Sequence, residues 1–531
     1  MADPISRRAF VGTSILAGTG LVTGRLHGWS PADGAPAIIT ADRLRPVVAN
    51  GVQSGDVTAS RAIVWSRSDR AARMHVDWST NERFTDARTM RGPAAMEGTG
   101  FTGHVDLRDL PADEQVFYRV RFESLESPGA WSEPLVGTFR TAPTAAKRVR
   151  VAWSGDMVGQ GWGIDESRGG IRMYDALRRA EPDVFIHSGD NIYADQPLLP
   201  EVTLDDGTIW RNLVTEAKSK VAETVDEFRG NYAYNMLDEQ VRRFHAAVPM
   251  IAQWDDHEVV DNWFDGLMLD RDPRYTVKSV SLLAARAHQA MFEFLPIRRN
   301  SDEAGRVYRQ FSYGPMLDIF VIDLRSYRGA NSPNRQAEAS EATTLLGAAQ
   351  LAWLKDALRN SRALWKVIAC DMPIGLVVPD RMRDGVRNYE AWANAEDGAP
   401  LGRELEVADL LRFMKQQRIR NTVWVTADVH YAAAHHYSPD NAQFTDFDPF
   451  WEFVAGPMHA GTFGPNALDA TFGPEVRFTT TAPGIRPNRP PSDNLQFYGT
   501  LDIDPATRAL TAGIWDVTGR RLWQTEVAPV E

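Results

Sequence analysis

The chain has 531 residues, of which 43% are hydrophobic, and this length and composition predict a globular protein with two domains rather than one. The formal net charge of −12 argues against nucleic acid as the main partner, because a phosphate backbone is bound by a basic face. The single cysteine, Cys370, excludes an intramolecular disulfide scaffold, and the sequence has no run of about 20 apolar residues that would predict a membrane-spanning helix.

The first residues are predicted to be an export signal and not part of the fold. Arg7 and Arg8 follow Ser6 and precede a mildly apolar stretch, and this order resembles a twin-arginine signal. Residues 35–37 (Ala-Pro-Ala) have the small-x-small pattern of a cleavage site, so we expect a signal peptide over residues 1–37. The twin-arginine export machinery would then be a partner, and the bacterial protein would be periplasmic or secreted. The alternative is a disordered basic N-terminus.

Residues 45–143 are predicted to form a small β-sandwich. Short segments of alternating polar and apolar residues are separated by turn residues, and many strands at this spacing are typical of such a fold. The predicted strands are 62–65, 74–78, 101–107, 117–122 and 137–141. The arrangement is similar to a fibronectin type III module, and residues 142–147 are the predicted linker to the next domain.

Residues 148–531 have the pattern of an α/β domain, in which strands alternate with helices. In such sheets ligands bind beyond the carboxyl ends of the strands. The predicted helical regions are 170–180, 210–250 and 279–294. The predicted strands are 149–153, 184–187, 250–254, 316–323, 365–371 and 422–428, and a β-hairpin over 497–531 is predicted to close the sheet.

A carboxylate follows many of these apolar strands. The strand-end residues are Asp156, Asp190, Asp256, Asp371 and Asp428, and they are joined by Tyr193, His257, Asn262 and His430. One such aspartate alone is more often a helix cap or a turn residue than a ligand. Five carboxylates on one sheet edge would repel one another and raise their pKa values unless a cation neutralised them. The sequence therefore predicts a metal site at this edge.

The order of these motifs resembles the metallophosphatase superfamily. The motifs are Gly155-Asp156, Gly189-Asp190 with Tyr193, Asp256-His257-Glu258 and Asp428-Val429-His430. The segments 254–258 with Asn262, 51–56 and 320–325 are similar to the alkaline phosphatase D (PhoD-like) family. This resemblance covers the chain from about Pro46 to its end. It implies an α/β sandwich of central β-sheets flanked by helices, preceded in the chain by the N-terminal fibronectin III-like β-sandwich.

The resemblance also implies a set of metal ligands. In purple acid phosphatases, a related branch, iron(III) is held by two Asp, a Tyr and a His, and the residues that match are Asp156, Asp190, Tyr193 and His430. The residues at the second-site positions are Asp256, Asp371 and Asp428, with Asn262 beside them. Oxygen donors suit calcium, magnesium or manganese. The PhoD-like resemblance thus implies Fe3+ and Ca2+, with Mg2+ or Mn2+ as second-site alternatives. A Cys is expected at the Asp156 position in that family, which leaves the first metal open.

The activity that the resemblance implies is hydrolysis of a small phosphorylated substrate, a phosphate monoester or diester. A metal-activated hydroxide would attack phosphorus in line with the leaving group. His257 is the expected catalytic residue, and His257, Arg325 and His459 are expected to bind the substrate. Arg325 could instead pair with acidic neighbours. Monoesterases and diesterases differ in pocket shape, so the motifs leave that choice open. We expect a monomer.

Two other interpretations remain. An exported calcium-binding or adhesion module without catalysis would explain the aspartates, but it has no use for Tyr193, His257 and His430 at these spacings. A zinc hydrolase of another fold would need more His or Cys ligands than the motifs supply.

Overall fold

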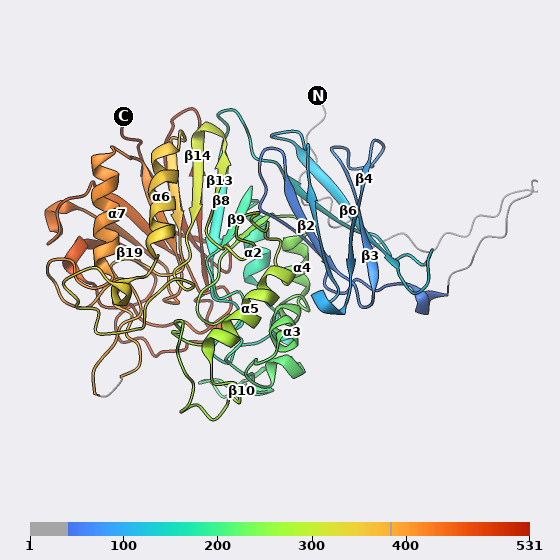
Figure 1. Ribbon diagram of the computed structural model, residues 1–531, viewed down its shortest axis with the longest axis horizontal. Helices are drawn as coiled ribbons and strands as arrows, with labels where there is room; N and C mark the ends of the chain where they lie inside the picture. The colour runs from blue at the N-terminus through green and yellow to red at the C-terminus, as the bar shows by residue number, and fades with distance from the viewer. Residues whose placement is uncertain (1–40, 383–384) are drawn as a thin grey trace, which may run out of the picture.

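The computed structural model describes residues 41–382 and 385–531, so the predicted signal peptide lies outside the described residues. Two large sheets stack against each other, helices cover both outer sides, and a β-sandwich lies at one side (Figure 1). This α/β sandwich with an N-terminal β-sandwich confirms the fold class predicted from the sequence. No helix in the described part of the chain is both long and apolar enough to cross a membrane.

The larger sheet has nine strands in the order β22-β21-β20-β8-β9-β12-β1-β2-β5. Its central strands β8, β9, β12 and β1 are parallel, so their carboxyl ends point the same way. The strands are β1 (Val52–Gly55), β2 (Ala62–Arg67), β5 (Thr102–Leu107), β8 (Val149–Ser154), β9 (Val184–His187), β12 (Met250–Ala252), β20 (Phe497–Ile503), β21 (Leu510–Asp516) and β22 (Arg521–Val527).

The second large sheet has seven strands in the order β13-β14-β15-β16-β18-β17-β19. β14, β15, β16 and β18 are parallel in its centre. The strands are β13 (Arg309–Tyr313), β14 (Leu317–Val321), β15 (Trp365–Ala369), β16 (Thr422–Thr426), β17 (Ala433–Tyr437), β18 (Phe450–Val454) and β19 (Pro474–Thr479). A two-stranded ribbon, β10 (Glu201–Thr203) with β11 (Ile209–Arg211), lies apart from both sheets.

The N-terminal sandwich shares a sheet with the α/β part. Its four-stranded sheet, in the order β4-β3-β6-β7, packs against β1, β2 and β5, which belong to the nine-stranded sheet. The four strands are β3 (Ala72–Ser79), β4 (Arg88–Ala95), β6 (Gln115–Ser124) and β7 (Leu135–Arg140). Buried residues of both layers, such as Val64, Val76 and Val120, form the core between them.

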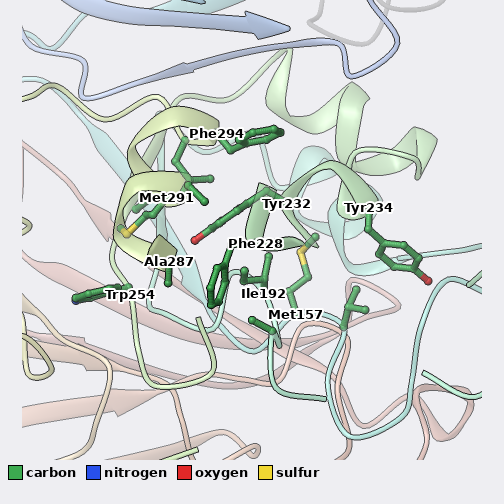
Figure 2. Close-up of a cluster of buried hydrophobic side chains, with 14 of the residues drawn as sticks. Met157, Ile192, Phe228, Tyr232, Tyr234, Trp254, Ala287, Met291 and Phe294 are labelled. Carbon is green, nitrogen blue, oxygen red and sulfur yellow. The ribbon is translucent and has the colours of Figure 1, made fainter. Parts of the chain in front are cut away.

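Three apolar layers hold the α/β part together. Between the two large sheets, residues such as Ile186, Ile251 and Val425 form an apolar core. The outer face of the nine-stranded sheet is covered by α2 (Met173–Arg179), α3 (Val225–Asn235), α4 (Glu239–His245) and α5 (Val280–Phe294). Tyr232 of α3 stacks on Phe294 of α5 with ring centroids 6.0 Å apart (Figure 2). The outer face of the other sheet is covered by α6 (Ala348–Asn360) and α7 (Glu404–Gln416).

The helix starts follow from local sequence. Thr224 and Glu227 form a reciprocal capping box at the start of α3, and the Ser279 hydroxyl accepts the Leu282 N–H at the start of α5.

Two expectations about secondary structure needed correction. The region 210–250 is helical only in a short 3-10 helix (Glu216–Lys218), in α3 and in α4, and the C-terminal segment forms three strands rather than a hairpin.

Candidate metal centre

The strand-end aspartates converge at one pocket, but they come from two sheets and not from one. Asp156, Asp190 and Asp256 follow β8, β9 and β12 of the nine-stranded sheet, whereas Asp428 and His430 follow β16 of the other. Because the parallel strands of both sheets end on the same side, these side chains converge. A pocket of about 730 Å³ opens there, and Asp190, Asp256, His257, Asn262, Asp428 and His430 line it.

Two overlapping groups of ligand atoms lie within this region. One oxygen or nitrogen each from Asp156, Asp190 and His430 lie within 4.8 Å of one another, and the same holds for Asp190, Asp256 and His257. Asp190 belongs to both groups, as a carboxylate shared between two metal ions would. The side chains in both groups are buried.

Tyr193 completes the first group. Its hydroxyl donates a hydrogen bond of 2.9 Å to Nε2 of His430, and Nδ1 of His430 donates one of 2.5 Å to the Gly461 carbonyl oxygen. This arrangement keeps the lone pair of Nε2 facing Tyr193 and Asp156, whose Oδ1 is 3.8 Å away. Burial lowers the pKa of His430 to about 4, so the imidazole is neutral and suited to metal ligation.

Asp195 fixes the orientation of the His257 imidazole. Its Nδ1 donates a hydrogen bond of 2.9 Å to Oδ1 of Asp195, while Nε2 lies 3.9 Å from Asp256 Oδ1. The imidazole also stacks on Tyr193, with ring centroids 4.3 Å apart. Burial alone would lower the pKa of His257, but the carboxylates of Asp195, Asp256 and Asp190 raise it well above the ordinary value. Asp195 and Tyr193 thus hold His257 in a fixed orientation at the pocket wall.

The electrostatics of the carboxylates fit a bound cation. Burial, together with the neighbouring Asp255, raises the pKa of Asp156 well above its usual range, and burial raises that of Asp256 to about 6. The pKa of Asp190 is also raised well above normal, mainly by burial. One carboxylate oxygen of Asp156, Oδ2, is buried without a hydrogen-bond partner among the described residues. A metal ion would satisfy that oxygen and stabilise all three carboxylates as anions.

The backbone at this pocket adopts unusual conformations. Asp156, Asp190, Asn262, Asp428 and His430 all have positive φ, between 50° and 65°. Asp and Asn tolerate this left-handed region better than most residues, and strained positions cluster at functional sites. The tight turn after each strand thus directs the side chain back toward the pocket.

The structure does not bring every predicted residue to the metal groups. Asn262 and Asp428 line the pocket, and the Asn262 N–H donates a hydrogen bond of 2.6 Å to Asp256 Oδ2. In contrast, Asp371 and Arg325 are fully buried against each other, with Arg325 Nε 3.3 Å from Asp371 Oδ2, and neither lines the pocket. His459 points elsewhere, because its Nε2 bonds to the Gly163 carbonyl and its ring lines a different cavity.

Comparison with known proteins places this geometry in a family. A family model described as PhoD-like phosphatase matches residues 151–514, and a model described as PhoD-like phosphatase, N-terminal domain matches residues 33–143. The chain belongs to the PhoD-like phosphatase family. Alkaline phosphatase D of Bacillus subtilis (strain 168) is 25% identical over 410 residues, which is 73% of this chain and 65% of that protein's length. The present chain thus spans slightly less than two thirds of this curated relative.

Two solved structures share the fold. The structure titled "Structure of PhoD" matches with a TM-score of 0.66 and 21% identity, covering 94% of both chains. Purple acid phosphatase PPD1 from yellow lupin (Lupinus luteus) matches with a TM-score of 0.55 and 11% identity, covering 91% of this chain and 74% of its own. The resemblance to the PhoD-like family that the motifs indicate is therefore confirmed.

Three residues of this PhoD-like site were not predicted from the sequence. Asp195, two residues after Tyr193, is buried and holds His257. Asp255, next to Asp256, is buried and pairs with Arg325. Arg387 is exposed and lines the pocket beside Tyr389 and Glu390. The double aspartate in 255–256 was the available signal for Asp255, whereas the positions of Asp195 and Arg387 depend on tertiary structure alone.

Proposed function

We propose that the protein is a metal-dependent phosphoesterase that hydrolyses phosphate monoesters, diesters or both, in the pocket lined by Asp190, Asp256 and His430. The observation that carries the proposal is the pair of ligand groups that share Asp190. Two metal ions joined by one carboxylate are a common device for in-line displacement at phosphorus. Family membership supports the same activity.

In the first proposed metal site, the ligands are Asp156, Asp190, Tyr193 and His430. In the second, they are Asp190 and Asp256, with oxygens from Asn262 and Asp428 available in the same pocket, and we assign His257, the third member of that ligand group, to the substrate instead. We propose Fe3+ for the first site, because a phenolate is a hard anionic donor, and Ca2+ for the second, with Mg2+ or Mn2+ as alternatives. We assign Asp371 to the buried ion pair with Arg325 instead of to a metal.

When bound, such metal ions polarise phosphoryl oxygens and lower the pKa of water. The chain's own residues position the substrate. His257, held by Asp195, presents its Nε2 to a phosphoryl or leaving-group oxygen. The exposed guanidinium of Arg387 supplies a further phosphate-binding group at the pocket wall.

Metal removal tests this function. Chelation is expected to abolish hydrolysis of p-nitrophenyl phosphate and bis(p-nitrophenyl) phosphate, and added Fe3+ with Ca2+ is expected to restore it, since the carboxylates lose their cations. Steady-state rates before and after chelation, with metal content by mass spectrometry, provide the measurement. The ratio of the two rates distinguishes monoester from diester preference. Chelator-resistant hydrolysis, or no hydrolysis by folded, metal-loaded protein, would contradict the proposal and favour a non-catalytic calcium-binding module.

The Asp195–His257 contact gives a second test. Asp195→Asn is expected to lower kcat/KM by about 10–100-fold, because the imidazole loses its charged orienting partner. If Asp195 acts through His257, the double variant Asp195→Asn/His257→Gln is expected to be no slower than His257→Gln alone. Additive losses in the double variant would mean that Asp195 works independently of His257.

We also propose the domain division and location that the sequence indicates. The proposed units are residues 1–37 as a twin-arginine signal peptide, residues 45–143 as the N-terminal sandwich and residues 148–531 as the catalytic domain. Two matches to separate PhoD-like models, over 33–143 and 151–514, support a boundary near residue 147. A periplasmic or secreted bacterial monomer remains our proposal for the mature protein, and the arginine pair at Arg7 and Arg8 supports export.

A further inference from the structure

A second, larger pocket lies where the N-terminal sandwich meets the α/β part. Its volume is about 860 Å³. Strands β2 and β5 form one wall, the segment from Ile297 to Phe311 forms the other, and Trp353 of α6 closes one side. None of the described residues that line it also lines the metal pocket. In Figure 1 the sandwich lies beside the helical layer that contains α5, whose C-terminal end leads into this segment.

The charge of this pocket is opposite to that of the protein. Six arginines and two aspartates line it, which gives a formal excess of four positive charges in a chain with net charge −12. The arginines are Arg61, Arg108, Arg298, Arg299, Arg306 and Arg309. We refer to this site as the arginine pocket. A concave wall of one sign concentrates the electrostatic field and attracts ions of the other sign.

Two aspartates anchor half of these arginines. The buried Asp56 accepts one bifurcated hydrogen bond from Arg309 Nε, at 3.2 Å to each carboxylate oxygen, and one of 2.9 Å from Arg309 Nη2. It also accepts the backbone N–H of Arg298 at 2.7 Å. Asp106 pairs with Arg61, and its Oδ1 lies 3.3 Å from Arg298 Nη2. These ion pairs fix the positions of Arg61, Arg298 and Arg309 along the pocket wall. Both aspartates that line the pocket are engaged in these pairs.

The remaining three arginines are unpaired or only weakly paired among the described residues. In the described part of the chain neither Arg299 nor Arg306 forms an ion pair, and Arg108 has only a 3.7 Å approach to Asp106 with two thirds of its side chain exposed. Arg306 Nε and Arg298 Nε are buried without a hydrogen-bond acceptor. Buried donors of this kind are normally satisfied, so an acceptor from outside the chain would complete them.

Aromatic rings hold the two unpaired guanidinium groups in place. The Arg306 guanidinium lies 4.9 Å from the centroid of the Tyr308 ring, and that of Arg299 lies 5.1 Å from Phe292. Stacking of this kind reduces the side-chain entropy that a ligand would otherwise have to remove.

We propose that the arginine pocket binds a small anion with two or more neighbouring phosphate groups. Planar guanidinium groups match phosphate oxygens geometrically, and the unpaired cations Arg299 and Arg306, together with the weakly paired Arg108, exceed what a single phosphate needs. The volume admits a diphosphate or triphosphate, free or carried on an organic group. This site is separate from the proposed metal centre, so it does not depend on the phosphoesterase activity.

Calorimetric titration tests the proposal with two probes that resist hydrolysis, methylenediphosphonate and adenosine 5′-(α,β-methylene)diphosphate. Both are expected to bind the metal-loaded protein, and Arg299→Ala/Arg306→Ala is expected to weaken that binding about tenfold or more, because charge-assisted hydrogen bonds are lost. The control Arg83→Ala/Arg271→Ala removes the same charge from exposed arginines outside the pocket and is expected to change affinity less than twofold. Asp190→Asn separates binding in the arginine pocket from binding at the metals.

The outcomes are distinct. Loss of affinity in Arg299→Ala/Arg306→Ala, with the control and Asp190→Asn unaffected, supports the site whether or not the protein hydrolyses esters. Equal weakening in the control means nonspecific charge attraction and overturns the proposal. Loss of all binding in Asp190→Asn means that the probes occupy the metal centre, and this too overturns it, as does an absence of binding to the wild-type protein. Binding of the nucleotide probe alone would restrict the ligand to organic diphosphates within the same site.

Discussion

Replacement of Asp190 by asparagine is expected to lower kcat/KM for phosphate ester hydrolysis by about 10³-fold or more, since metal ions contribute several kcal/mol of transition-state stabilisation. Asp190 is the one residue common to both ligand groups, and its Oδ1 also accepts the His257 N–H at 3.1 Å. Asparagine has nearly the same shape but carries no charge, so the substitution weakens both proposed metal sites at once. Steady-state kinetics and metal content by mass spectrometry measure the effect.

The matched control is Asp356→Asn, which removes the same charge from an exposed side chain on α6. It is expected to leave both activity and metal content unchanged. Unfolding curves for the two variants distinguish loss of metal from loss of fold. If Asp190→Asn retains its metals and more than a tenth of the activity, Asp190 is not the shared ligand and the two-metal arrangement is wrong.

The local motifs predicted several of the strand-end side chains that the structure brings together. Each Gly-Asp or Asp-His pair stands at the end of a parallel strand, and the positions of Asp156, Asp190 and Asp256 follow directly from that topology. Asp428 and His430 also reach the pocket, but from the facing sheet. A sequence pattern shows that a strand ends in a carboxylate. It does not show which of two stacked sheets the strand belongs to.

The sequence did not show which strand-end side chains are buried beneath the pocket and which line it. Asp371 and Asp428 both follow apolar strands of one sheet, yet Asp371 is turned beneath the pocket toward Arg325 whereas Asp428 lines the pocket. Their strands run in the same direction and their sequence contexts are alike. The difference comes from the turn after the strand, where Asp428 has a φ of 63°. Such a turn is set by tertiary contacts that periodicity does not reveal.

The fold class could be predicted from the sequence, but the strands that connect its parts could not. Strand β4 was missed because it contains Gly92 and Pro93 and alternates between exposed and half-buried residues, a weak strand pattern. Strand β1 was missed because all four of its residues are buried, which removes the alternation. That strand joins the N-terminal sandwich to the central sheet, through Gly55 opposite Met250, so its omission hid the continuity of the nine-stranded sheet.

Replacement of Arg325 by methionine is expected to lower the free energy of unfolding by about 3–5 kcal/mol, because it leaves several carboxylates buried without their counter-ion. The Arg325 side chain is fully buried and pairs with Asp255, with Glu390 at 3.1 Å and with Asp371 at 3.3 Å. Methionine fills much of the volume of the alkyl chain, so the loss reports charge and not cavity formation. Denaturant unfolding of the metal-loaded proteins measures the effect.

This prediction also separates the two roles that the sequence left open for Arg325. The control Arg359→Met breaks an exposed pair with Asp356 on α6 and is expected to cost less than about 0.5 kcal/mol. A large loss of stability, with KM little changed in the folded fraction, means that Arg325 has a structural role. It then acts by holding Asp255, the neighbour of Asp256, in place. If instead stability is preserved and KM rises, Arg325 binds the substrate directly, and the buried carboxylates must take their positive charge from a metal ion.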